Sequence, residues 1–310
     1  MISMILVAAL AATLPTFETF RRVDRERRES GKWETEETTA LTRVDPKAVV
    51  ALAEQRPNDA MLQWGAAELL RDWPRREPRF LAALAASGTN TAIALRFGCV
   101  AAQTGHNELG LAWLRYCHPR DPSNAVPWLV GWSVLQQKGP PPATWRPPAG
   151  ATVYNDCGAD AARVRIRVLE ALGYTPYAAR RIGYAIDMPV LPMIRNLARE
   201  PAANRRDWLL RVVRSMQQGT TFLVTELVGQ SAENGLLAQE GGAATGGAVA
   251  DRVAELKVRR ESLTELTRDV GLTVIDAATE AELIRYYDEM LTLGEEAALQ
   301  RLARTVRGGR

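Results

Sequence analysis

The stretch that decides the fold is Gly105–Gly139, GHNELGLAWLRYCHPRDPSNAVPWLVGWSVLQQKG. Its first glycine ends an apolar, helix-forming run, and a second run of helix formers begins two residues later. Pro122 closes that second run. Ser123 and Asn124, residue types that cap helix N-termini, then open a third run. The stretch therefore predicts short helices that are joined by tight turns and packed in pairs.

Three segments of the chain share this kind of start at a nearly constant spacing. The alanines near their beginnings, Ala60, Ala92 and Ala125, lie 32 and 33 residues apart. A period of this length is typical of repeats that consist of two helices. Upstream of the first segment, Asp45 is the expected N-cap of another helix, with Pro46 at its first position. The pattern predicts about three helix–turn–helix units within residues 45–139.

On these residues the region 45–139 resembles the tetratricopeptide repeat (TPR) family. The positions that carry the resemblance are Gly105, Gly110, Leu114, Cys117, Pro122, Ala125, Trp128 and Gly139. The sequence departs from the family at Trp132, a position that the family usually keeps small. The resemblance implies an α-solenoid, in which helix pairs stack because no pair can bury its apolar face alone. It also implies a concave surface that binds a peptide or a partner protein.

Composition and charge favour a helical protein and disfavour polyanionic partners. Of the 310 residues, 46% are hydrophobic, and alanine and leucine dominate them. The 39 basic and 36 acidic residues give a net charge of only +3, so we expect neither nucleic acid nor an anionic membrane as a partner. The predicted fold class is all-α, with an N-terminal TPR-like α-solenoid of helix pairs followed by a C-terminal helical bundle.

The N-terminal segment has two interpretations. Met1–Leu14 is apolar but shorter than the roughly 20 residues that span a bilayer, so we expect no transmembrane span there. Residues 1–20 fit a signal peptide, with Ala9–Ala11 as the cleavage motif, or an apolar helix that packs on the scaffold. The first interpretation predicts export to the periplasm or envelope, and the second a cytoplasmic protein. Residues 21–44 carry charges of both signs and read as a charged linker or exposed helix.

A proline-rich run at 140–150 is the predicted linker between the two halves. Residues 151–310 form the predicted C-terminal helical domain, which contains a glycine-rich loop at 241–247 without a phosphate-binding signature. A helix opened by Thr175-Pro176 is expected to break at Pro189 and Pro192. The other helices are expected at 160–172, from Asn204 or Asp207 to Met216, at 220–237, 251–269, 279–291 and 295–306. Thr279 and Glu282 have the spacing of a capping box.

Two carboxylates are the only candidates for chemistry. Glu226 and Glu233 are seven residues apart and therefore share one face of the predicted helix. Such a pair can do acid–base work, as in glycosidases, or be paired inside a helical core. Neither the three cysteines (Cys99, Cys117, Cys157) nor the two histidines (His106, His118) show the spacing of a metal site. We expect the thiols to be free and buried. If the chain is exported, one disulfide can form between two of them.

The function that these features favour is a non-enzymatic TPR-like scaffold that binds a protein or peptide. The residues expected to contact the partner are Trp64, Arg96, Trp128 and Trp132. Large aromatics at helical spacing also fit packing between helices, so that alternative stays open. Two other functions remain: an exported, envelope-associated structural protein, and a helical hydrolase that uses Glu226 or Glu233. No catalytic, cofactor-binding or metal-binding residue is predicted, and the sequence leaves the oligomeric state open.

Overall fold

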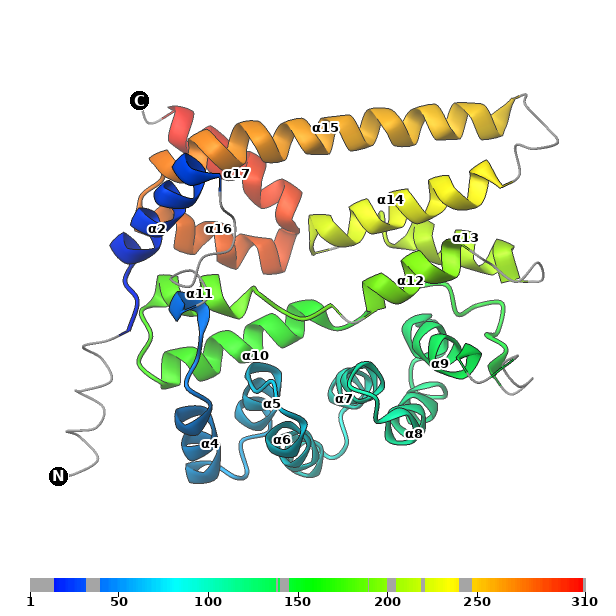
Figure 1. Cartoon of the computed structure of the whole chain (residues 1–310), viewed down its shortest axis with the longest axis horizontal. Helices are drawn as coiled ribbons and strands as arrows, with labels where there is room; N and C mark the ends of the chain where they lie inside the picture. The colour runs from blue at the N-terminus through cyan, green and yellow to red at the C-terminus, as the bar shows by residue number, and fades with distance from the viewer. Residues whose placement is uncertain are drawn as a thin grey trace. The chain divides into compact units, whose positions relative to one another are not determined.

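The computed structural model describes residues 14–31, 40–137, 139, 145–188, 190–199, 205–218, 221–239 and 247–308, with the backbone alone at 269–272. Every regular element in these ranges is an α-helix (Figure 1), and the only β-type pairing there is an isolated bridge between Asn124 and Val153. The all-α prediction is confirmed. The chain divides into two compact units, one of residues 1–89, 159–186 and 275–288, the other of residues 90–158, 187–274 and 289–310.

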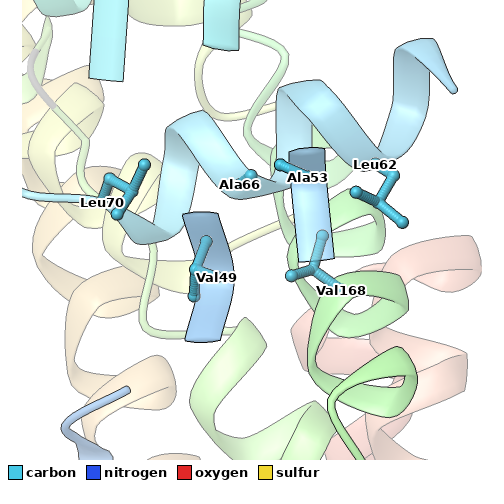
Figure 2. Packing of buried hydrophobic residues seen from close by; sticks show 6 residues of the cluster. All are labelled: Val49, Ala53, Leu62, Ala66, Leu70 and Val168. Atoms are coloured by element: carbon cyan, nitrogen blue, oxygen red, sulfur yellow. The ribbon is translucent and has the colours of Figure 1, made fainter. Parts of the chain in front are cut away.

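The first unit contains helices of 8 to 14 residues, several of which are capped by a side chain at the N-terminus. Its helices are α2 (Phe17–Ser30), α4 (Pro46–Gln55), α5 (Ala60–Leu69), α6 (Trp73–Ala86), α10 (Gly158–Ala171) and α11 (Pro176–Gly183). The Asp45 carboxylate accepts from the Lys47 amide, which confirms the predicted cap of α4. The core of this unit (Figure 2) joins α4, α5 and α10 through Val49, Ala53, Leu62, Ala66, Leu70 and Val168.

A glycine sets the distance between α5 and α10. A Cβ atom at Gly65 would lie 2.2 Å from the carbonyl oxygen of Val164. Only a residue without a side chain therefore lets the two helices approach this closely.

The two capping bonds at the start of α16 (Glu280–Leu293) confirm the predicted capping box. The Thr279 amide donates to the Glu282 carboxylate, and the Glu282 amide donates to Thr279 Oγ1.

The second unit contains the helices in and around Gly105–Gly139. They are α7 (Thr91–Gln103), α8 (Asn107–Cys117), α9 (Val126–Gln136), α12 (Val190–Arg199), α13 (Arg206–Ser215), α14 (Leu223–Ala238) and α17 (Glu295–Gly308). Helix α9 packs on α7, α8 and α12, and α14 packs on both α12 and α13. The long helix α15 (Ala248–Ala277) and α16 carry residues of both units.

The α7–α8 hairpin has the geometry predicted for a helix pair. Gly105 has φ +86°, a left-handed conformation that suits glycine, and it makes the turn. A Cβ atom at Gly110 of α8 would lie 2.9 Å from the Ala102 amide nitrogen and from the Gly98 carbonyl oxygen of α7. The pairs α5–α6 and α7–α8 both form. They belong to different units, so the predicted stacking into a solenoid stays a prediction.

Two helices differ from the sequence-based expectation. Helix α15 continues to Ala277 instead of ending near 269. Helix α12 replaces the break expected at Pro192, which is the third residue of that helix. Proline is tolerated there, because the first turn of a helix has no intrahelical acceptor for its N–H groups.

Several predicted features fall partly or wholly outside the described residues. These are the apolar segment 1–13, residues 32–39 of the charged stretch, residues 140–144 of the proline-rich run and residues 241–246 of the glycine-rich loop. The linker predicted at 140–150 remains a prediction, and the two compact units divide the chain along different lines. Among the helices that are described, none combines the length and apolarity needed to cross a bilayer.

Candidate functional site

The four residues expected to contact a partner are all buried in the structure. Trp64 lies in α5 of the first unit, where its indole N–H donates to Glu68 at 3.1 Å. Arg96, in α7 of the second unit, is fully buried and donates through Nη2 to the Asp187 carbonyl oxygen at 3.1 Å. These contacts make both side chains part of the chain's own packing.

Trp128 and Trp132 lie one turn apart on α9 and contact different groups. The Trp128 ring stacks on His118 with 3.6 Å between ring centroids. Burial, followed by the nearby Arg115 charge, lowers the pKa of His118 to about 4, so the imidazole is neutral at physiological pH. The Trp132 ring packs on Trp208 of α13. All four residues are buried by packing contacts within the chain. Binding of a partner by these residues remains a prediction.

The carboxylates Glu226 and Glu233 share one face of α14 as predicted, and each is engaged by arginine. The Glu233 side chain has no exposed surface, and it accepts from Arg214 Nε at 2.8 Å and from Gln217 Nε2 at 2.7 Å. Arg252 of α15 adds two further bonds, at 3.0 and 3.1 Å. Burial alone would raise the pKa of Glu233, but these hydrogen bonds outweigh it and hold the pKa below its ordinary value.

Glu226, which lies about two turns before Glu233 on α14, is paired in the same way. Arg259 of α15 donates to its carboxylate at 2.8 and 3.3 Å, and Gln230 donates at 2.9 Å. The same guanidinium also pairs with Glu296 of α17. A carboxylate whose oxygens are occupied by arginine and glutamine is poorly placed to exchange a proton with a substrate. The geometry therefore favours a structural ion-pair network that joins α13, α14, α15 and α17 over the predicted acid–base pair.

The N-terminus of α14 is closed by a third carboxylate. Glu295, at the start of α17, accepts from the Leu223 amide at 2.8 Å, while its own amide donates to the Thr221 carbonyl oxygen at 2.9 Å. Burial raises the pKa of Glu295, and the bond from Leu223 only partly opposes this. This reciprocal cap fixes α17 against the first turn of α14.

The three cysteines are buried, and no disulfide joins them. Burial raises the pKa of Cys117 to about 12 and the pKa of Cys99 well above its usual range. Cys157 is also buried, and no disulfide joins it to another cysteine. The expectation that the thiols are buried is confirmed. In the ranges that the structure describes, no three histidine, cysteine or acidic side chains are grouped so that they could hold a metal ion.

A polar cleft lies between the end of α9 and α12. It has a volume of about 280 Å³ and is lined by Ser133, Gln136, Gln137, Asn196 and Leu197. The three amide side chains are exposed, and within the described part of the chain none of them forms a hydrogen bond. Both walls come from packed helices, because α9 lies directly on α12. The cleft thus presents uncommitted donors and acceptors on a rigid base.

A second hollow, of about 350 Å³, lies along α15. Its lining consists of the charged and polar side chains Lys257, Arg260, Glu261, Thr264, Glu265 and Arg268, all from one helix. Among the described residues, no second helix contributes a side chain to this lining. For that reason the smaller α9–α12 cleft is the better candidate for a preformed site.

The residues of the α9–α12 cleft are absent from the sequence-based prediction. The signal on α9 is a polar end, Ser133, Gln136 and Gln137, on a helix that is otherwise apolar. Asn196 gives no comparable signal, because Pro189 and Pro192 suggest irregular chain around it.

The chain was compared with protein-family models, curated proteins and solved structures, and it matches none of them.

Proposed function

We propose that the chain is a non-enzymatic scaffold that binds a short extended segment of a protein or peptide in the α9–α12 cleft. The observation that carries the proposal is the cleft lining, in which Gln136, Gln137 and Asn196 are exposed and uncommitted on packed helices. The side-chain amide fits a peptide backbone because it offers one acceptor and two donors in a plane.

The chemistry of the lining also sets the partner class. None of the described residues that line the cleft is charged, so these side chains offer no counter-charge to a phosphodiester backbone. Leu197 is the apolar residue of the described lining. It can pack against one aliphatic or aromatic side chain of the bound segment. A volume of about 280 Å³ is at the small end of ligand pockets, and it fits a few residues at most.

The finer fold belongs to the same proposal. The helix pairs α5–α6 and α7–α8 would stack with α9 as a TPR-like solenoid, and the later helices would form a bundle that caps it. The close approach at Gly110 and the left-handed turn at Gly105 support this, because both are packing features of such repeats. In this arrangement the cleft would lie where the repeat ends and the bundle begins.

A displayed library of random peptides tests the proposal. The double variant Gln136→Ala, Asn196→Ala removes amides from both walls, and Gln103→Ala is the matched control. Gln103 is an exposed glutamine at the last position of α7, as Gln136 is at the last position of α9. Peptides enriched on the parent chain should bind Gln103→Ala equally and the double variant about tenfold more weakly.

Two outcomes contradict the proposal. The library fails to enrich any peptide on the parent chain, or the enriched peptides bind the double variant as tightly as the parent. The double variant should keep the parent's circular dichroism spectrum and unfolding midpoint, since exposed amides contribute little to stability.

A further inference from the structure

Arg205 is a buried cation on a rigid support. It directly precedes α13, and only 9% of the residue is exposed. Its guanidinium carbon lies 3.5 Å from the centroid of the Trp132 ring, which packs in turn on Trp208. A guanidinium that lies over an aromatic face is held in place by a cation–π contact, and this contact does not occupy its N–H donors. The site is therefore preorganised by two tryptophans from different helices.

This cation lacks a counter-charge within the described residues. Its Nη1 atom is buried and has no hydrogen-bond partner. Burial, followed by the positive charge of nearby Arg146, lowers the pKa of Arg205. Asp207 is exposed, and no ion pair joins it to Arg205 or Arg146 in the part of the chain that the structure describes. A buried guanidinium with an unpartnered nitrogen is unfavourable unless an anion or another acceptor binds it.

Arg205 also stands at the start of α13, where a second positive charge is unfavourable. It is the N-cap residue of α13 and makes no side-chain capping bond. A guanidinium has no acceptor atom, so it cannot satisfy the free amides of the first turn. The start of a helix also carries partial positive charge, which favours an anion and disfavours another cation. The unpartnered guanidinium and the start of the helix therefore both favour an anion at this position.

We propose that Arg205 is an oxyanion-binding site that takes a carboxylate or phosphate group of the bound peptide. This inference rests on the proposed function, because the peptide supplies the anion. Trp132, which supports Arg205, and Gln136 of the cleft are four residues apart on α9 and therefore share a face. An extended peptide in the cleft can reach the guanidinium within about one helical turn.

The two features divide the recognition between them. The cleft amides bind the peptide backbone without regard to sequence, and Arg205 selects segments with an anionic group at one position. Both a carboxylate and a phosphate fit the planar N–H fork of arginine. A preference for carboxylate indicates that the partner contributes an acidic side chain or a free C-terminus. A preference for phosphate indicates a phosphorylated residue.

Free anions test the site without any peptide. The unfolding midpoint is measured in acetate, in inorganic phosphate and in chloride at matched ionic strength. Acetate or phosphate should raise the midpoint of the parent chain relative to chloride, because a ligand of the native state stabilises it. Arg205→Gln should lose this response. Arg120→Gln is the matched control and should keep it, because Arg120 also stacks at 3.5 Å on a ring, that of Tyr116, but donates to a carbonyl oxygen.

A second readout uses the peptides that the library selects. They should be acidic or phosphate-mimicking at one position, and Arg205→Gln should weaken their binding about tenfold or more. An equal anion response in the parent and Arg205→Gln overturns the inference. So does equal peptide binding by the parent and Arg205→Gln, which leaves the proposed function intact. An anion response without any selected peptide instead contradicts the proposed function, and the oxyanion site then stands without its peptide.

Discussion

The α7–α8 hairpin and the α14–α15 pair hold two helices together by opposite means. In the hairpin, glycine and alanine bring the backbones so close that Gly110 has no room for a side chain. In the α14–α15 pair, long arginines reach from one helix to buried carboxylates on the other. The first contact depends on volume and the second on charge. The two pairs should therefore respond to different perturbations.

The largest expected effect comes from filling the hairpin. Gly110→Val places a branched side chain where a Cβ atom would already meet two backbone atoms at 2.9 Å. The helices must separate, and we expect a loss of about 3 kcal/mol in the free energy of unfolding, the upper part of the range for overpacking. Urea unfolding measures it. A loss below about 1 kcal/mol would show that the hairpin is not tightly packed.

Removing the buried charge from α14 should have the next largest effect. Glu233→Gln leaves Arg214 and Arg252 without their shared partner. Both arginines are partly exposed and so screened by water, and we expect a loss of about 2 kcal/mol, less than for a fully buried pair.

Glu255→Gln is the matched control for that variant. It removes an exposed carboxylate from the same Arg252 and should change stability by less than about 0.5 kcal/mol. Equal effects of the two substitutions, measured by urea unfolding, would contradict the assignment of the network to buried charge.

Acid should weaken the α14–α15 pair and spare the hairpin. The pKa of Glu233 is lower in the folded chain than its ordinary value of 4.5. Its contribution to stability is therefore complete above that value and is lost as pH falls through the lower, folded pKa. The difference in unfolding free energy between the parent and Glu233→Gln should shrink in this acid range. The cost of Gly110→Val should stay constant, and a parallel decline of both would break the comparison.

The smallest effect should be a gain. A Cβ atom at Gly235 of α14 would meet no atom within 4 Å. Gly235→Ala should therefore stabilise the chain by about 0.5 to 1 kcal/mol, because alanine loses less backbone entropy in a helix. Thermal unfolding checks the sign. A loss instead of a gain would show that α14 is packed on this face as tightly as α8 is on α7.

The same comparison explains what could be predicted from the sequence. The turn at Gly105, the cap at Asp45, the capping box at Thr279 and the common face of Glu226 and Glu233 all depend on residues within about two helical turns of one another. Local spacing therefore predicts them. A helix pair closed by glycine also leaves a small-residue pattern in the sequence.

The candidate site depends on contacts that no local pattern encodes. Trp132 and Arg205 are far apart in the sequence, and their contact exists only because α9 and α13 meet through Trp208. Asn196 reaches the α9–α12 cleft on a helix whose prolines suggest a break. The burial of Trp64 and Trp128 has the same cause, since exposure is decided by the neighbouring helices and not by residue type.

The buried thiols make the chain a convenient object for site-specific labelling. All three cysteines of the sequence are enclosed, and burial keeps Cys99 and Cys117 protonated at neutral pH. Maleimide reagents attack an exposed thiolate, so the natural cysteines should react slowly. A cysteine introduced at Asn196 would then be the one fast-reacting group, and a fluorophore attached there would sense directly whether the α9–α12 cleft is filled.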